Sequence, residues 1–269
     1  MGYLIAISVY LLALVIYGLV IAHKKVKTAD DMVTGGHRIP FIILVGSLLA
    51  TWCGGGGITG SAGVVYSGGP WVGAITFAAP PIGIILLYFI AGKVRKSNKV
   101  TVPEIMEARY GKAASIISAL CVMLAYVGVL ATQLKAAADI LVLLCSSSGV
   151  ELSHGLALTI CTVVIVVITV GGGLVSVAYS DAISALIMIG GFFLAIPFLI
   201  SVANSQGAVL PPEKTTITGG MSGVEILGYF LPSLALMLGD QNMLQRFASA
   251  KNSDEAKKSN IGMFIGEIL

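Results

Sequence analysis

Four consecutive glycines, Gly54 to Gly57, lie in the middle of an uncharged apolar stretch that is long enough to cross a bilayer. Each glycine costs about 1 kcal/mol relative to alanine inside a helix, so the run predicts a break. In lipid, the backbone groups freed by a break must face protein or a water-filled cavity. Freed carbonyl oxygens suit a hard cation, and N–H groups at the positive end of the next helix suit a carboxylate. Secondary transporters use such a broken helix to hold an ion and a substrate.

Close packing of neighbouring helices is the alternative explanation of these glycines. Small-residue spacing accounts for Gly60 and Gly63, but it accounts less well for four glycines in a row. We therefore favour a functional break.

Two further groups of ionisable residues lie within apolar stretches. Asp181 precedes a long apolar run, where a carboxylate is a functional candidate and equally a helix N-cap. Lys135 and Asp139 are four residues apart, so on a helix they share a face and can pair. For this pair, a structural ion pair is favoured over a role in an outer vestibule.

The composition is that of an integral membrane protein. Of 269 residues, 57% are hydrophobic and 11% charged, and the mean hydropathy is +0.96. A soluble domain carries about 25% charged residues. The apolar runs are too long and continuous for a β-barrel, so helices are expected. The four scattered cysteines form no Cys-x-x-Cys pair and are interpreted as small apolar residues.

Seven apolar spans are expected, each near or above the ~20 residues that cross a bilayer, apart from a somewhat short fifth. They cover about residues 3–22, 41–66, 71–92, 113–144, 155–171, 178–203 and 223–244, with an eighth beginning near Ile261. We expect one transmembrane domain over residues 1–269.

Basic residues sort to one side of these spans. With the N-terminus outside, the inner segments hold 14 of the 16 lysines and arginines, because only Lys135, within a span, and Lys214, in an outer loop, lie elsewhere. The positive-inside rule therefore places the N-terminus outside.

Local signals mark several span ends. Thr101 is expected to cap a short amphipathic helix at the inner surface, and Pro80-Pro81 should kink the third span. Arg246 is expected to anchor the seventh span at the inner interface. Asp240 and Gln241 beside it either close an inner gate or cap the C-terminal end of a helix.

Five short motifs occur in order along most of the chain. They are Gly-Gly-His-Arg at 35–38 with Pro40, Tyr-Ser-Gly-Gly at 66–69, Thr-Val-Pro-Glu at 101–104 with Arg-Tyr-Gly at 109–111, Gly-Gly-Leu at 172–174 with Tyr-Ser-Asp at 179–181, and Asp-Gln-Asn-Met-Leu-Gln-Arg at 240–246. Together they resemble motifs of the sodium:solute symporter family.

The resemblance implies an all-α integral membrane protein with the broken-helix, five-plus-five inverted-repeat transporter fold. The first span would be an extra helix, the next five would form the first repeat, and the seventh would open the second repeat. The chain would then be truncated after the first repeat plus the start of the second, as the N-terminal fragment of a transporter about twice as long.

The resemblance also implies a sodium ion as the coupling ion. Its expected ligands are the backbone carbonyls of Ala50 and Cys53, and Asp181 would serve sodium release towards the cytoplasm. The family's hydroxyl ligands from the eighth core helix would lie beyond Leu269.

The residues expected beside the solute are Trp52, Gly54, Gly57, Ser61, Thr76, Ser233 and Leu236. Sugar-transporting relatives carry glutamine, glutamate, asparagine and tyrosine in place of Gly57, Thr76, Ser233 and Leu236, and this chain lacks all four. Proline-transporting relatives carry aspartate where Trp52 stands. Because glycine N–H groups suit a carboxylate, an amino acid or organic acid is favoured over a sugar.

The predicted function is sodium-coupled symport of a small organic solute across the plasma (inner) membrane by alternating access. The alternative is a transporter-like sensor module of a signalling protein. An enzyme is not expected, because the three histidines lie in or at loops on both sides. The expected partners are sodium, the solute and the lipid bilayer, without nucleic acid, and the oligomeric state stays open.

Overall fold

The computed structural model describes residues 2–207 and 209–269, and the regular secondary structure of that part is helical apart from one isolated β-bridge between Ile39 and Ala250. The α-helices are α1 (Gly2–Lys25), α2 (Ala29–Thr34), α3 (Phe41–Trp52), α4 (Gly55–Gly68), α5 (Pro70–Phe77), α6 (Ala79–Ser97), α7 (Val102–Tyr110), α8 (Lys112–Ser147), α9 (His154–Ser205), α10 (Gly223–Gly239), α11 (Gln241–Ser249) and α12 (Ser253–Ile268). Two 3-10 turns are η1 (Gly35–His37) and η2 (Pro212–Thr215).

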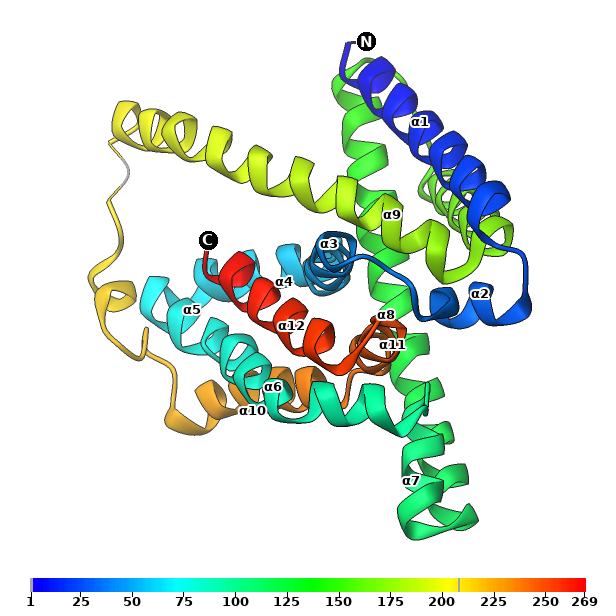
Figure 1. Cartoon of the computed structure of the whole chain (residues 1–269). Helices are drawn as coiled ribbons and strands as arrows, with labels where there is room; N and C mark the ends of the chain where they lie inside the picture. The colour runs from blue at the N-terminus through cyan, green and yellow to red at the C-terminus, as the bar shows by residue number, and fades with distance from the viewer. Residues whose placement is uncertain (1, 208) are drawn as a thin grey trace.

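Helix α3 lies at the centre of the molecule, between α9 and α12 (Figure 1). Its Leu44 and Leu48 are fully buried and pack in one apolar cluster with Leu87 of α6 and Phe247 of α11. At Gly46 the backbones of α3 and α9 approach closely, because a Cβ added there would lie 2.7 Å from the Cα of Ala182. The first half of the glycine-containing span is therefore the packed core.

The predicted break is present directly after α3. Helix α3 ends at Trp52, Cys53 leaves the helical conformation with φ −80° and ψ 56°, and α4 begins at Gly55. The axes of the segments Phe41–Trp52 and Gly57–Gly68 differ by 51°. This confirms a broken helix at the glycine run.

Three other interruptions shape the longer helices. Ala78 separates α5 from α6 just before Pro80-Pro81, where the sequence predicts a kink. Asp240 separates α10 from α11, an interruption that the predicted span 223–244 does not contain. Within α9, Gly173 adopts a positive φ of 55°, and a Cβ there would lie 2.5 Å from the carbonyl oxygen of Met32.

Within residues 2–207 and 209–269, five helical segments are long and apolar enough to cross a membrane, with α5–α6 and α10–α11 each counted as one segment. The number is six when the bent pair of α3 and α4 is also counted as one span. Helix α9 contains 52 residues, which corresponds to about 78 Å at 1.5 Å per residue. That is more than twice the ~30 Å thickness of the hydrocarbon core. Gly173 divides α9 between the two predicted spans 155–171 and 178–203, whose separate crossings stay a prediction.

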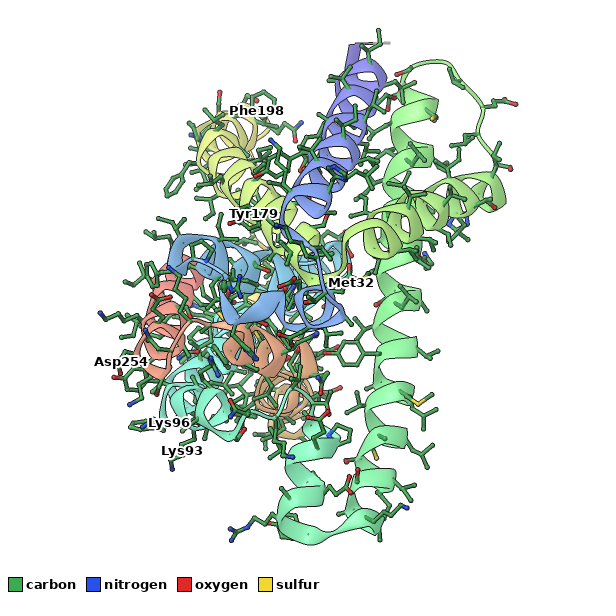
Figure 2. The ribbon with its side chains drawn as sticks, turned by 45° about the vertical axis from the view of Figure 1, so that its right-hand side comes forward. Met32, Lys93, Lys96, Tyr179, Phe198 and Asp254 are labelled. Atoms are coloured by element: carbon green, nitrogen blue, oxygen red, sulfur yellow. The ribbon has the colours of Figure 1, made fainter. Side chains whose placement is uncertain are left out.

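Helices α7 and α8 form a projecting hairpin at one side of the molecule (Figure 2). Thr101 caps α7 as predicted, since its Oγ1 accepts from the Glu104 N–H at 3.3 Å. Along α8, large apolar side chains such as Leu124, Val127 and Leu143 are more than 60% exposed. Such a face suits lipid or further protein, not water.

Candidate functional site

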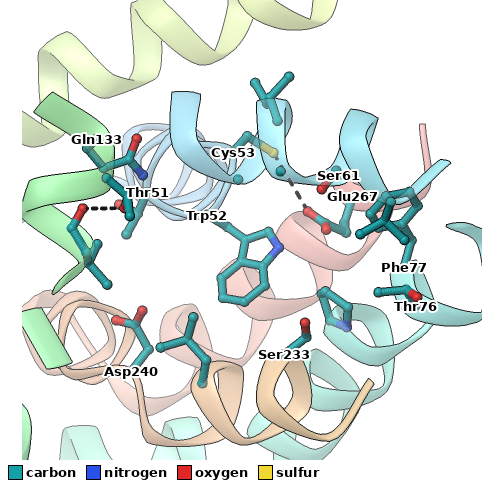
Figure 3. A pocket seen from close by; sticks show the side chains of 18 of the residues that line it. Thr51, Trp52, Cys53, Ser61, Thr76, Phe77, Gln133, Ser233, Asp240 and Glu267 are labelled. Atoms are coloured by element: carbon teal, nitrogen blue, oxygen red, sulfur yellow. Dashed lines mark hydrogen bonds between the residues drawn. The ribbon is translucent and has the colours of Figure 1, made fainter. Parts of the chain in front are cut away.

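A cavity of about 740 Å³ lies beside the break between α3 and α4 (Figure 3). Its walls come from α3 to α6, from α8 and α9, and from α10 to α12. The volume is in the range of pockets that enclose small organic ligands. The broken helix thus forms one wall of a ligand-sized space.

Most residues expected beside the solute line this cavity. They are Trp52, Gly57, Ser61, Thr76, Ser233 and Leu236. Gly54 is not among the lining residues, because Gln133 of α8 packs over it: a Cβ added at Gly54 would lie 2.1 Å from Gln133 Nε2. Gly54 therefore permits the close approach of α8, whereas the expectation had placed it against the solute.

The lining hydroxyls mostly donate to their own helices. Thr76 Oγ1 donates to the Val72 carbonyl at 2.8 Å, and Ser233 Oγ donates to the Tyr229 carbonyl at 3.0 Å. Each oxygen keeps lone pairs, so towards the cavity these groups act as hydrogen-bond acceptors.

Glu267 of α12 is a cavity residue that the sequence reasoning missed. Its carboxylate accepts a hydrogen bond from the Trp52 side chain, and Oε2 lies 4.0 Å from Cys53 Sγ. One signal could have found it, since Glu267 is the single ionisable residue of the final apolar run 261–269.

Tyr126 and Gln133 were also missed. Both lie on α8, which contributes a whole wall of the cavity through Ala125, Tyr126, Val129, Thr132 and Gln133. A signal could have found them, because Tyr126 and Gln133 are polar residues in a mostly apolar span and are seven positions apart, so they share one helix face.

The backbone hydrogen bonding changes at the break. In a continuous helix the Gly54 N–H would donate to the Ala50 carbonyl, but it donates to the Trp52 carbonyl at 2.9 Å. The Ala50 carbonyl oxygen is thereby released from the helical ladder. Coordination of sodium by Ala50 and Cys53 stays a prediction.

Asp181 belongs to a buried polar cluster with Ser47 and Arg246. Asp181 Oδ2 accepts from Ser47 Oγ at 2.8 Å and from Arg246 Nη2 at 3.0 Å, and Arg246 Nε donates to Ser47 Oγ at 2.7 Å. Arg246 also donates to the Asn242 carbonyl at 3.3 Å. A buried ion pair is tolerable when further hydrogen bonds satisfy its members, as they do here. The cluster ties α3, α9 and α11 together.

This cluster corrects two expectations. Arg246 is only 5% exposed, so it is an internal partner of Asp181 and not an anchor at the membrane interface. Asp181 stands inside the helical run of α9, so it is not an N-cap either. Its proposed part in sodium release is untested by this geometry.

Asp240 caps a helix, and Gln241 holds the segment before α7 by hydrogen bonds. Asp240 Oδ1 accepts from Tyr126 Oη at 2.8 Å and from the N–H groups of Asn242 and Met243, which caps the start of α11. Gln241 bonds the backbone N–H of Val102 at 2.7 Å through Oε1. Asp240 stands both at the C-terminal end of α10 and at the start of α11, and its side chain caps the start of α11.

The predicted pair on α8 is confirmed, with a third member. Lys135 Nζ lies 2.7 Å from Asp139 Oδ2, and His154 Nε2 lies 2.8 Å from Asp139 Oδ1. The group links α8 to the start of α9. All three side chains are more than 40% exposed, and none of them lines the cavity.

The described chain resembles known transporters in sequence and in fold. The model of the sodium:solute symporter family matches residues 32–268. The high affinity choline transporter 1 of Homo sapiens is 26% identical over 94% of this chain and 46% of its own length. The sodium/sialic acid symporter NanT of Aliivibrio fischeri is 26% identical over 96% of this chain and 52% of its own length.

A solved structure supports the fold. The substrate-bound, outward-open state of a Na⁺-coupled sialic acid symporter matches with a TM-score of 0.74 and 20% identity, over 97% of this chain and 56% of that chain. At this identity the match speaks for the fold alone. The chain spans about half the length of the curated relatives that it matches.

Proposed function

The chain belongs to the sodium:solute symporter family, and from that membership we propose that it serves sodium-coupled uptake of a small organic solute by alternating access. The family and its relatives are transporters and not enzymes. The observation that carries the proposal is the cavity of about 740 Å³ at the broken helix, where an ion and a solute can bind side by side.

Sodium is the coupling ion of the family. We place it against the carbonyl oxygens of Ala50 and Cys53, since the shifted hydrogen bond of Gly54 supports a free acceptor at Ala50. Sodium is a hard cation that prefers oxygen ligands, so the identities of the two side chains matter little.

The relatives do not name the solute, because their own names cover choline, sialic acid and glucose. The cavity favours an amino acid or organic acid over a sugar. A sugar needs many donors and acceptors around its ring, while Thr76 and Ser233 have already committed their protons to backbone carbonyls.

We propose that the cluster of Ser47, Asp181 and Arg246 closes the cytoplasmic side when the cavity faces outward. The placement rests on the distribution of basic residues, which puts the N-terminus on the outer side of the plasma membrane and the end of α11 on the cytoplasmic side. Opening inward would separate α11 from α9 at the Arg246–Asp181 pair, which is 3.0 Å long in this structure.

The direct test is uptake by the full-length protein in proteoliposomes with an inward sodium gradient. A panel of radiolabelled amino acids, organic acids and sugars would be offered with sodium, with potassium in its place, and at several pH values. Accumulation of one solute class with sodium alone is expected. Equal accumulation in sodium-free buffer would overturn the coupling.

A further inference from the structure

We infer that the cavity recognises an ammonium group, which binds at the Glu267 carboxylate and against the face of the Trp52 indole ring. The inference rests on the proposed transport function and narrows its solute class. It favours amines and amino acids over organic acids that lack nitrogen.

The formal charges around the cavity are all negative. Among the described lining residues the acids are Asp240 and Glu267, and there is no lysine, arginine or histidine. The ion pairs of the described chain involve Asp139 and Asp181, so neither cavity acid is neutralised by a cation of the protein. A negatively charged solute would meet repulsion here, and a positively charged one attraction.

The two acids differ in what they still offer to a ligand. Asp240 is committed to structure, because its Oδ1 accepts from Tyr126 Oη and from two backbone N–H groups of α11. The Glu267 carboxylate has polar contacts only with the Trp52 side chain and the weak thiol donor of Cys53 among the described residues. A carboxylate within an apolar span is costly unless it meets water or a cation. Glu267 is therefore the acid with capacity for a ligand.

The surroundings of Glu267 fit a cation with N–H groups. Figure 3 shows the Trp52 indole projecting into the middle of the cavity between Glu267 and Ser233. An aromatic face attracts a cation within about 6 Å of its centroid. The lone pairs of Thr76 and Ser233 can accept hydrogen bonds from an ammonium, since both hydroxyl protons are already used within their helices.

The same cavity also offers backbone donors to a carboxylate. Gly57 lines the cavity in the first turn of α4, where backbone N–H groups are not all used within the helix. The positive end of the helix favours an anion there. A zwitterionic amino acid can therefore satisfy both ends, whereas a simple carboxylic acid leaves Glu267 unpaired.

The first test measures the charge preference of the cavity without any transport. In full-length protein, every cysteine except Cys53 is replaced by alanine, including Cys121, Cys145 and Cys161. The remaining Cys53 thiol is modified with the cationic trimethylammonioethyl methanethiosulfonate or with the anionic sulfonatoethyl methanethiosulfonate. Each rate is divided by the rate at which the same reagent reacts with free 2-mercaptoethanol, which corrects for the intrinsic reactivity of the reagent. We expect the cation to react roughly tenfold faster or more, as for an adjacent unscreened carboxylate.

Variants assign that preference to Glu267. Glu267→Gln should remove most of the preference, Glu267→Asp should keep it, and Glu151→Gln, an exposed acid in the loop before α9, should leave it unchanged. Equal rates in the unsubstituted protein, or an undiminished preference in Glu267→Gln, would overturn the inference. Equal rates in the protein with native Glu267 would overturn the inference even if Glu267→Gln fails to fold.

The second test uses sodium-driven uptake of matched compounds. Each amino acid that is transported is compared with its N-acetyl derivative, which keeps the carboxylate and loses the charge on nitrogen. Glu267→Gln should raise the KM of the free amino acid roughly 10- to 100-fold, as for loss of a charged hydrogen bond. Sodium-driven uptake that ignores acetylation would refute ammonium recognition and leave the symport proposal standing. Uptake without sodium would refute symport, while the labelling result would stand.

Discussion

Arg246 and Asp181, 65 positions apart in the chain, form a 3.0 Å ion pair beneath the fully buried hydroxyl of Ser47. The pair joins a short helix after the α10 break to the middle of the longest helix. The pair should contribute to the free energy of unfolding because it is shielded from water, since the Arg246 side chain is only 6% exposed.

Substitution Asp181→Asn should destabilise the protein by about 3 kcal/mol, because it leaves the Arg246 guanidinium buried without its counter-charge. Thermal unfolding of the purified protein in detergent measures this loss. Asp139→Asn removes an equivalent carboxylate from the exposed pair with Lys135 and should shift the midpoint far less. Equal shifts for the two variants would contradict a structural weight of the buried pair.

Substitution Gly173→Ala should also destabilise the fold by about 1–3 kcal/mol from the backbone conformation alone, because φ 55° and ψ −155° lie in a region that is essentially restricted to glycine. The new Cβ would in addition lie 2.5 Å from the Met32 carbonyl oxygen, so α2 would be displaced. Gly190→Ala lies in the same helix with open space around it and is the matched control. Unfolding midpoints that agree between the two variants would show that the bend in α9 does not require glycine.

The side chains of Ala50 and Cys53 should be dispensable for sodium dependence. If backbone carbonyls hold the ion, Ala50→Ser and Cys53→Ala will leave the sodium concentration for half-maximal uptake nearly unchanged. Uptake measured over a series of sodium concentrations tests this directly. A strong loss of sodium affinity in Cys53→Ala would contradict coordination by the backbone alone and would indicate that the Cys53 side chain takes part.

Helix α2 should fray in acid. The backbone N–H of Lys27 and the hydroxyl of Thr28 donate to Asp31 and lower the pKa of its carboxyl below the ordinary value of 3.8. A carboxyl with a lowered folded-state pKa stabilises the fold fully above its unfolded value, and this contribution is lost as the pH falls through the folded value. The test compares the hydrogen-exchange protection of residues 29–34, relative to an unfolded peptide at the same pH, near pH 6 and near pH 3. Protection should be lower near pH 3, and Asp31→Asn should weaken this pH dependence.

The sequence predicts those features that depend on neighbours in the chain. The break at Cys53–Gly54 follows from consecutive glycines, the Lys135–Asp139 pair from helical spacing, and the Thr101 cap from its distance to Glu104. In each case the interacting groups lie within a few residues, so local periodicity contains the information.

Other features depend on tertiary packing and escape such reasoning. Glu267 meets Trp52 only because α12 crosses the end of α3, and Arg246 meets Asp181 only because α11 turns inward after Asp240. Charge patterning suggested an interfacial Arg246, since most arginines at span ends remain solvated. One buried carboxylate on another helix outweighed that general tendency.

The two halves of the broken helix differ in how they are held. Helix α3 is fixed to α9 twice, by the close approach of Gly46 to Ala182 and by the Ser47–Asp181 hydrogen bond. Helix α4 continues beyond two residues that are free of the helical conformation, at an angle of 51°. The junction at Cys53–Gly54 is thus where the packing partners of the span change, from α9 and α12 around α3 to α5 and α8 around α4. Trp52, as the last residue of α3, is positioned by the core of the molecule.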